Sequence, residues 1–190
     1  MLSDVLVVEL PPVFEQLGIG GILSPQHLLE TEYVALDGPG KRLVLLEGSA
    51  DAVVAWLQLS NATREVHQVK AQRQMPGLLH LAVSVDALDP VATLVDTGGS
   101  DSEFLVSYLG KPTGPEVAGG VSAGGKQMVA TASEKRTVRF GDLKVGPITL
   151  QGKPALSDPY HQGILGFNAL RTLTVAIPNG AGLVMVFARP

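Results

Sequence analysis

Short apolar runs separated by turns rich in glycine and proline recur through the second half of the chain. Residues 79–85 alternate between large apolar residues and small or polar ones, residues 86–90 contain turn formers, and residues 91–95 form a continuous apolar run. Alternation with a period of two predicts a half-buried strand, and a short continuous apolar run is typical of a buried strand. We therefore expect a β-hairpin whose second strand leads directly into Asp96.

Further strands are predicted downstream of this hairpin. Residues 101–109 lead away from Asp96, and the glycines and prolines of residues 110–115 interrupt them. Residues 135–140 alternate again, and residues 143–150 follow after a glycine turn. The pattern indicates an all-β chain with frequent turns.

Composition supports this class and excludes others. The 190 residues include 22 glycines and 13 prolines, which agrees with many turns, and they suffice for one or two small domains. A net charge of −4 with 17% charged residues leaves no basic patch, so nucleic acid is not an expected partner. Because the chain has no cysteine, disulfides, thiol catalysis and cysteine-based zinc sites are excluded.

Neither a membrane span nor a metal site is expected. No apolar stretch reaches the roughly 18–20 residues that a spanning helix needs, and residues 1–4 lack the positive charge that opens a signal peptide. The sequence thus predicts a soluble chain and does not indicate its compartment. The histidines show no metal-ligand spacing, and we expect them to be structural or solvated, with no metal or cofactor: His27, His67, His80 and His161.

An imperfect internal repeat links the two ends of the chain. Each copy reads as strand, short helix, strand, glycine-rich turn and strand. The first copy comprises residues 21–29, 33–40 and 43–46, and the second comprises residues 163–170, 174–180 and 183–186. Repeats of this kind are typical of duplicated structural units.

One acid turn follows a predicted buried strand. The apolar run at 91–95 leads into Asp96-Thr97-Gly98, and Ile164-Leu165-Gly166 occurs in the second copy of the repeat. Taken alone, Asp-Thr-Gly is also typical of an ordinary turn, because these residue types all favour turns. The buried strand, the acid turn and the later Ile-Leu-Gly together resemble the aspartic proteases of the retropepsin and pepsin type.

This resemblance implies both a fold and site residues. The fold is an all-β, retropepsin-like closed antiparallel β-barrel with a short helix near residues 169–173, preceded by a partial repeat of the same unit. In the family, a strand that ends in an apolar-apolar-Gly tripeptide crosses the acid turn and helps to hold it. Asp96 is then the catalytic acid, Thr97 braces the partner loop, and Gly98 lets two backbones approach closely.

The implied chemistry requires two carboxylates that share one proton, because two like charges ~3 Å apart do not both ionise readily. One carboxylate activates a water molecule, and the other acid protonates the peptide carbonyl. The chain supplies one acid turn, and Asp101 and Glu103 do not lie in a second one. The resemblance therefore implies that the partner is a second copy of Asp96 across a two-fold axis or a separate upstream lobe.

A glycine-rich segment occurs where the family carries its flap, a mobile hairpin that closes over an extended peptide. Its candidate substrate-binding residues are Gly119, Gly120, Val121, Ser122, Ala123 and Gly124. An ordinary hairpin turn is the alternative interpretation. A phosphate-binding loop is not expected, because Gly-Lys-Ser/Thr is absent and no βα unit surrounds the segment.

Three parts of the chain are predicted. Residues 1–48 form a partial first-lobe repeat, residues 49–77 form a connector, and residues 78–190 form the retropepsin-like domain. In the first part no acid turn precedes Ser24, which stands where the second copy has Gly166. Either an upstream half has been removed, or the first lobe has degenerated into a structural element.

Two polar stretches are expected at the surface. Residues 61–74 form the most polar run of the connector and are predicted to be a solvated face, and residues 158–162 are predicted to be a surface turn. Residues 52–59 are apolar enough to be buried but too short for their period to distinguish helix from strand.

The sequence therefore predicts an aspartic endopeptidase that acts on peptide or protein substrates, active as a homodimer or with an upstream lobe. The alternative is a non-catalytic, protein-binding or regulatory domain on the same scaffold. The missing first acid turn and Ser24 favour that alternative.

Overall fold

Strands dominate the computed structural model, which describes residues 33–60, 66–72, 78–117, 131–156, 159–178 and 183–188, together with Pro12. The strands are β1 (Tyr33–Asp37), β2 (Arg42–Leu46), β3 (His67–Gln72), β4 (His80–Val85), β5 (Val91–Val95), β6 (Ser102–Leu105), β7 (Glu116–Val117), β8 (Thr131–Phe140), β9 (Leu143–Lys153), β10 (Gly163–Leu165), β11 (Leu173–Pro178) and β12 (Leu183–Ala188). The helices are α2 (Ala50–Ser60), α3 (Val106–Leu109) and α4 (Phe167–Leu170).

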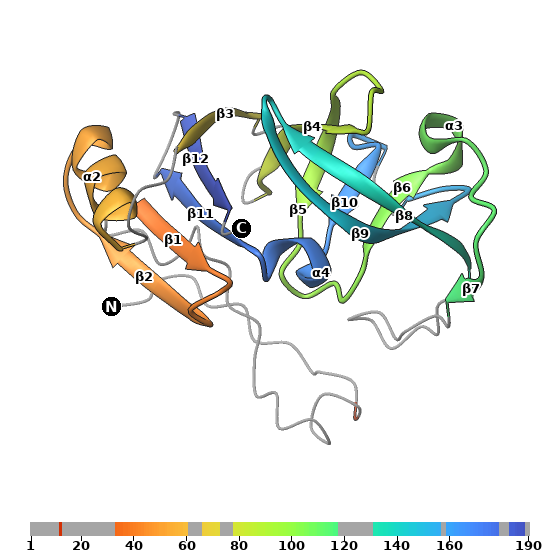
Figure 1. Ribbon diagram of the computed structural model, residues 1–190, viewed down its shortest axis with the longest axis horizontal. Coiled ribbons are helices and arrows are strands. Elements are labelled where there is room, and N and C mark those ends of the chain that lie inside the picture. The colour runs from red at the N-terminus through yellow and green to blue at the C-terminus, as the bar shows by residue number, and fades with distance from the viewer. Residues whose placement is uncertain are drawn as a thin grey trace.

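Six strands form a closed barrel, in the order β4-β5-β10-β6-β9-β8, which closes because β8 pairs with β4 (Figure 1). Its interior is filled by apolar side chains, among them Phe104, Phe140, Leu81 and Leu150, each at most 1% exposed. The predicted all-β, closed-barrel fold is confirmed. Two of its pairings are parallel, because β10 inserts between β5 and β6 and pairs parallel with β5, and β6 pairs parallel with β9.

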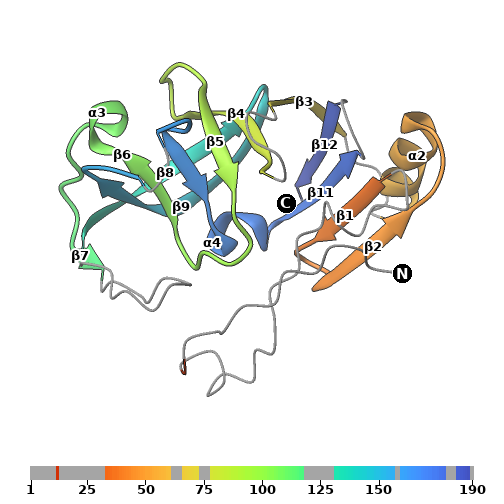
Figure 2. The same cartoon turned by 180° about the vertical axis from the view of Figure 1, so that it is seen from behind.

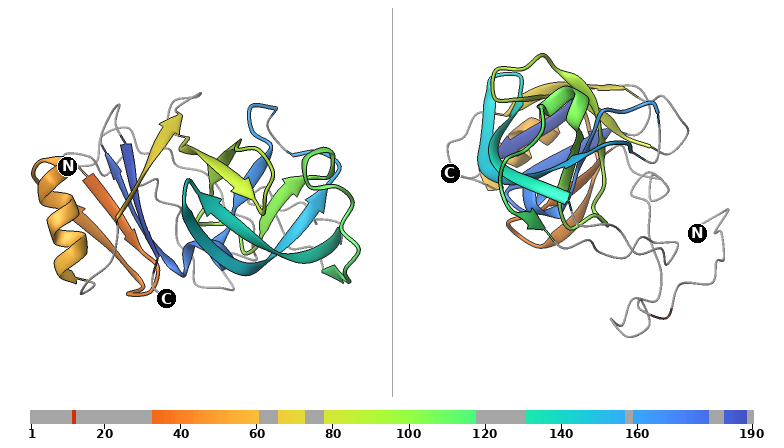
Figure 3. Two further views of the ribbon diagram at one scale, coloured as in Figure 1. Left: turned by 45° about the horizontal axis from the view of Figure 1, so that its top comes forward. Right: turned by 90° about the vertical axis from the view of Figure 1, so that its right-hand side faces the viewer.

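A second sheet continues from the barrel in the order β2-β1-β11-β12-β3, and β3 joins the two because it also pairs with β4 (Figure 3). Helix α2 packs on this sheet through Val53 and Leu57, four residues apart on one helix face, which contact Ala35 and Ala176. Residues 61–74, predicted to be solvated, contribute β3, whose Val69 is buried.

Two hairpins of the second sheet have the same register. Ala35 of β1 lies opposite Val44 of β2, and Ala176 of β11 lies opposite Met185 of β12. Ala35 and Ala176 also lie opposite each other where β1 and β11 pair. The β11–β12 pair therefore repeats the β1–β2 pair with one constant offset in residue number, and β1 and β11 pair antiparallel about Ala35 and Ala176. A local two-fold axis between these two alanines relates one hairpin to the other. The assignment of residues 1–48 to a first lobe stays a prediction.

The turn between β1 and β2 is fastened to β11 by a buried carboxylate. Asp37, 3% exposed, accepts hydrogen bonds from the Gly40 amide (3.1 Å), the Thr174 hydroxyl (3.1 Å) and Arg42 Nε (2.8 Å). Burial raises the pKa of Asp37, but the hydrogen bonds from Arg42, Gly40 and Thr174 outweigh it and hold the pKa below its usual value of 3.8. The charged form therefore stabilises the joint between the two hairpins.

Replacing Asp37 by Asn is expected to reduce the free energy of unfolding by about 1–3 kcal/mol at pH 7, because a charged acceptor is lost at a buried position. A carboxyl whose folded-state pKa is depressed contributes stability above the unfolded-state pKa, and this contribution is lost as the pH falls through the folded-state value. Urea unfolding at pH 7 and near pH 3 should therefore show a difference between wild type and Asp37→Asn that shrinks in acid. Asp89→Asn, an exposed aspartate, is the control; equal losses in both variants would contradict this role.

Several local predictions need correction. Strand β5, predicted to be buried, is half-buried except at Thr93, and residues 106–109, predicted to continue a strand, form α3. The short helix lies at 167–170 rather than near 169–173, because Leu173 already begins β11. His161, predicted to lie in a surface turn, is 2% exposed and packs near His80 with ring centroids 5.7 Å apart. Backbone hydrogen bonds hold the turn against the barrel: the Gln162 backbone N–H donates to the Ala92 carbonyl, and the Gln162 carbonyl accepts from the Leu105 N–H.

Candidate active site

Asp96 follows the last residue of β5, the strand that lies beside β10 in Figure 2. The Asp96 amide donates to the Leu165 carbonyl (3.0 Å), and the Val95 amide donates to the Leu79 carbonyl (2.9 Å). Strand β10 pairs with β5 so that Leu165 lies beside Val95. The backbone that carries Asp96 is therefore fixed on both sides.

The loop after Asp96 is clamped by the start of α4. The Phe167 amide donates to the Gly99 carbonyl (2.6 Å), and the Asn168 amide donates to the Ser100 carbonyl (3.0 Å). A β-carbon on Gly166 would overlap the Asp101 carbonyl oxygen, so this contact requires glycine. The acid loop and α4 thus form one packed unit.

Polar side chains beneath the loop complete this unit. The Ser102 hydroxyl donates to Asn168 Oδ1 (2.7 Å) and accepts the Gly166 amide (3.1 Å), while Asn168 Nδ2 donates to the Thr149 carbonyl (2.7 Å). These contacts connect β6, α4 and β9. Their geometry fixes the loop independently of any substrate.

The Asp96 carboxylate lies open at the tip of this assembly. Its Oδ1 accepts the Gly98 amide at 2.8 Å. A β-carbon on Gly98 or Gly99 would approach the carboxylate oxygens to 3.2 or 3.3 Å, so glycine keeps the approach to them clear. Asp96 is half-buried, and Thr97 and Gly98 are exposed. The acid turn is therefore available to a second molecule or lobe.

The neighbouring acids are engaged elsewhere. Asp101 Oδ2 accepts hydrogen bonds from the Ser100 hydroxyl and Gln151 Nε2, both at 3.1 Å. Glu103 forms an ion pair with Lys153 at 3.2 Å. Both carboxylates therefore have partners other than Asp96.

The candidate flap residues 119–124 lie outside the described residues. The residues on either side pair with each other, because Val117 of β7 lies opposite Thr131 of β8. Gln151 connects this point to the acid loop, since its Oε1 accepts the Thr131 hydroxyl (2.8 Å) and its Nε2 donates to Asp101. The base of the candidate flap and the acid loop therefore share one hydrogen-bonded chain.

The sequence did not predict the supporting role of Gln151, Ser102 and Asn168. Gln151 and Ser102 are polar residues at buried positions, 3% and 0% exposed, in otherwise apolar strands. Strand alternation predicts that these two positions are buried, and a buried polar side chain needs a hydrogen-bond partner. This pattern could have identified both residues from the sequence. Asn168 follows Gly166 by two residues and could be found only from its contacts.

Neither a metal-binding cluster nor a membrane-spanning helix occurs among the described residues. No group of three or more histidine or carboxylate side chains there is arranged to hold a metal ion. No helix of the described part has the length and apolar character to cross a membrane.

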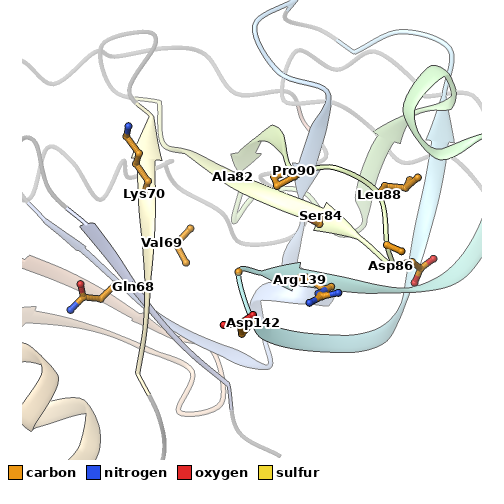
Figure 4. A pocket seen from close by; sticks show the side chains of 12 residues that line it. Gln68, Val69, Lys70, Ala82, Ser84, Asp86, Leu88, Pro90, Arg139 and Asp142 are labelled. Carbon is orange, nitrogen blue, oxygen red and sulfur yellow. The ribbon is translucent and has the colours of Figure 1, made fainter.

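A cavity of about 470 Å³ lies away from the acid turn, between β3, β4, the β4–β5 turn and the β8–β9 turn (Figure 4). Two cationic and two acidic side chains line it: Lys70, Arg139, Asp86 and Asp142. No residue of the acid loop lines it, so it is not the cleft expected beneath the candidate flap.

The comparisons with known proteins give likenesses to solved structures alone. No protein-family model matches the chain, and no curated protein matches it. Among solved structures, a retropepsin-like aspartic protease from Rickettsia conorii is similar. The two share 20% sequence identity with a TM-score of 0.47, over 65% of this chain and 93% of that chain.

Proposed function

We propose that this protein is an aspartic endopeptidase unit in which Asp96 supplies one of two catalytic carboxylates. The observation that carries the proposal is the half-buried carboxylate at the end of strand β5, on a loop clamped by β10 and α4. Such rigid placement is what a group that activates water requires, since catalytic geometry tolerates little movement.

The proposed reaction uses two carboxylates that hold one proton between them. The ionised carboxylate removes a proton from water, and the resulting hydroxide attacks the peptide carbonyl while the other acid protonates the carbonyl oxygen. The amide of Gly98 orients Asp96 through Oδ1. Collapse of the tetrahedral intermediate then expels the amine, which takes a proton from one carboxyl of the dyad, while a hydroxyl of the intermediate gives its proton to the other carboxylate and so restores the shared proton. We propose that Thr97 braces the opposing loop and that residues 119–124 cover an extended peptide.

The local two-fold axis bears on the source of the second carboxylate. A dyad needs two acid turns related by a two-fold axis, and such an axis already relates residues 33–46 to the β11–β12 hairpin within this chain. Because β1 occupies the free edge of β11, this arrangement supports a partner lobe that belongs with residues 1–48 over a second copy of this chain. A homodimer remains the competing arrangement.

The alternative function, a protein-binding or regulatory domain without catalysis, is favoured by one observation. The nearest acids in the sequence, Asp101 and Glu103, are committed to Gln151 and Lys153. If no partner supplies an acid turn, the same loop would only hold a polypeptide.

Peptide cleavage tests the proposal. A mixture of unstructured peptides would be incubated with the protein between about pH 3 and pH 7, the range in which paired carboxylates titrate, and products would be identified by mass spectrometry. We expect cleavage that is blocked by a non-cleavable peptide bearing a hydroxyl at the scissile position. Specific activity that rises with protein concentration would favour a second copy, and activity that appears only when a lobe with a second acid turn is supplied would favour a partner lobe. Binding of the hydroxyl peptide without any cleavage would replace the proposal with the non-catalytic alternative.

A further inference from the structure

The cavity between β3, β4 and the β8–β9 turn has the size and the apolar lining of a small-molecule site (Figure 4). Its volume of about 470 Å³ falls within the roughly 300–1,000 Å³ of typical ligand pockets. Val69 of β3 contributes apolar surface to it, as do Leu88 and Pro90 of the β4–β5 turn. Ala82 and Ser84 of β4 also line it, and their short side chains leave it open. The cavity therefore offers room and apolar contact to an organic group.

Arg139 of β8 lines this cavity without a partner of its own. Its side chain is half-buried, and within the described ranges it makes neither an ion pair nor a hydrogen bond. A guanidinium has five N–H donors, and donors that lose water without gaining an acceptor cost free energy. The other arginine of β8, Arg136, is by contrast bonded to Asp86 and Glu134. Arg139 is therefore available to an acceptor from outside the chain.

The residues opposite Arg139 supply further donors and no carboxylate. Ser84 of β4 and Lys144 of β9 each lie directly opposite Arg139 in the strand pairing, so the three side chains share one face of the sheet. In the described part of the chain, neither the Ser84 hydroxyl nor the Lys144 ammonium has a partner. Like charges directly opposite each other destabilise a strand pair. An anion held beside Arg139 and Lys144 would remove this cost.

We infer that the cavity is a binding site for a small organic carboxylate with an apolar body. The planar guanidinium of Arg139 matches the two oxygens of a carboxylate, and the Ser84 hydroxyl is placed to donate to the same group. The apolar body packs against Val69, Leu88 and Pro90. We call this site the Arg139 cavity.

The acidic residues of the lining favour a ligand with one negative charge over a ligand with two. Asp86 accepts hydrogen bonds from the Arg136 guanidinium (2.9 Å) and the Thr137 amide (3.0 Å), so its charge is balanced within the chain. Asp142 is exposed. Both carboxylates still line the cavity and repel a phosphate dianion more than a carboxylate. The charge of the lining thus points to a carboxylate.

An NMR titration of the isotope-labelled intact chain tests the site, with N-acetyl-leucine as the probe. We expect a dissociation constant on the order of 1 mM, as for a small ligand of ordinary efficiency, with shifts at the backbone amides of Ser84 and Arg139. N-acetyl-leucinamide lacks the carboxylate and acetate lacks the apolar body, so each should bind at least about tenfold more weakly. Inorganic phosphate that binds as tightly as N-acetyl-leucine would overturn the inference.

Two substitutions test the residues of the Arg139 cavity. Arg139→Gln should raise the dissociation constant at least about tenfold, because a charge-assisted bond is lost, and Lys144→Gln should raise it several-fold. Arg171→Gln makes the first change at an exposed arginine outside the lining and should have no effect. Thermal unfolding without ligand separates lost binding from a lost fold. Because each of the first two variants removes one of two opposed cations, neither should lower Tm.

The outcome does not depend on hydrolysis of peptides. Asp96→Asn should bind N-acetyl-leucine as the wild type does, so a failure of the proposed function is distinguishable from a failure of this site. Equal affinity in wild type and Arg139→Gln would overturn the inference. Absence of saturable binding by the wild type up to about 20 mM probe would overturn it as well.

Discussion

Replacing Asp96 by Asn is expected to lower peptide hydrolysis by at least about 10³-fold, the scale of a lost acid-base group, while the fold is retained. Asparagine has the same shape, and its side-chain oxygen still accepts the Gly98 amide that now bonds Oδ1. It can neither take a proton from water nor share one with a partner carboxylate. The substitution is therefore expected to slow the chemical step of hydrolysis without disturbing the structure of the loop.

Two measurements separate these effects. Cleavage rates report catalysis, and thermal unfolding reports the fold, for which we expect a change in Tm below about 2 °C, as for a substitution within ±0.5 kcal/mol. Asp142→Asn, in the exposed β8–β9 turn, makes the same substitution away from the loop and should leave the rate unchanged. Cleavage retained in Asp96→Asn would rule out Asp96 as a catalytic acid.

Replacing Gly166 by Ala is expected to reduce the free energy of unfolding by about 3 kcal/mol, the upper end of the usual range for overpacking, because the position is buried and rigid. The added β-carbon would overlap the backbone of Asp101, and no flexible side chain stands there to move away. Either the start of α4 or the acid loop must shift, which breaks the bonds from Phe167 to Gly99 and from Asn168 to Ser100. Activity should fall together with stability.

Gly141→Ala is the matched control for this substitution. A β-carbon there meets nothing within 4 Å, but the backbone has φ +60°, so only the cost of a left-handed alanine, about 1 kcal/mol, is expected. Urea unfolding of both variants gives the comparison. Equal losses would mean that the close approach of Gly166 to Asp101 is not what the acid loop depends on.

Local patterns predicted much of the barrel. The alternation at 79–85 and the apolar run at 91–95 correspond to the paired strands β4 and β5, and the glycine turn after Phe140 lies between β8 and β9. These features depend on neighbouring residues, whose period and turn chemistry a sequence displays directly. The all-β class follows from them.

Such local patterns do not predict contacts between residues far apart in the sequence. Nothing near Asp37 indicates that Thr174 will donate to it, and nothing near His161 indicates that the turn is drawn against His80. The same holds for Gln151, whose two bonds join the acid loop to the start of β8. Such pairs arise only when strands far apart in the chain become neighbours, so the polar support of the candidate site could not be anticipated.

The pairing of β1 with β11 also constrains the order in which the molecule can fold. Residues 33–37 of an early hairpin find their partners in residues 173–178, near the other end of the chain. Contacts of such long sequence separation form slowly, because a large loop must close before they are made. During synthesis, the edge of β1 that pairs with β11 stays unpaired until almost the whole polypeptide has been made. A chain truncated before Leu173 would leave that edge unpaired and prone to aggregation.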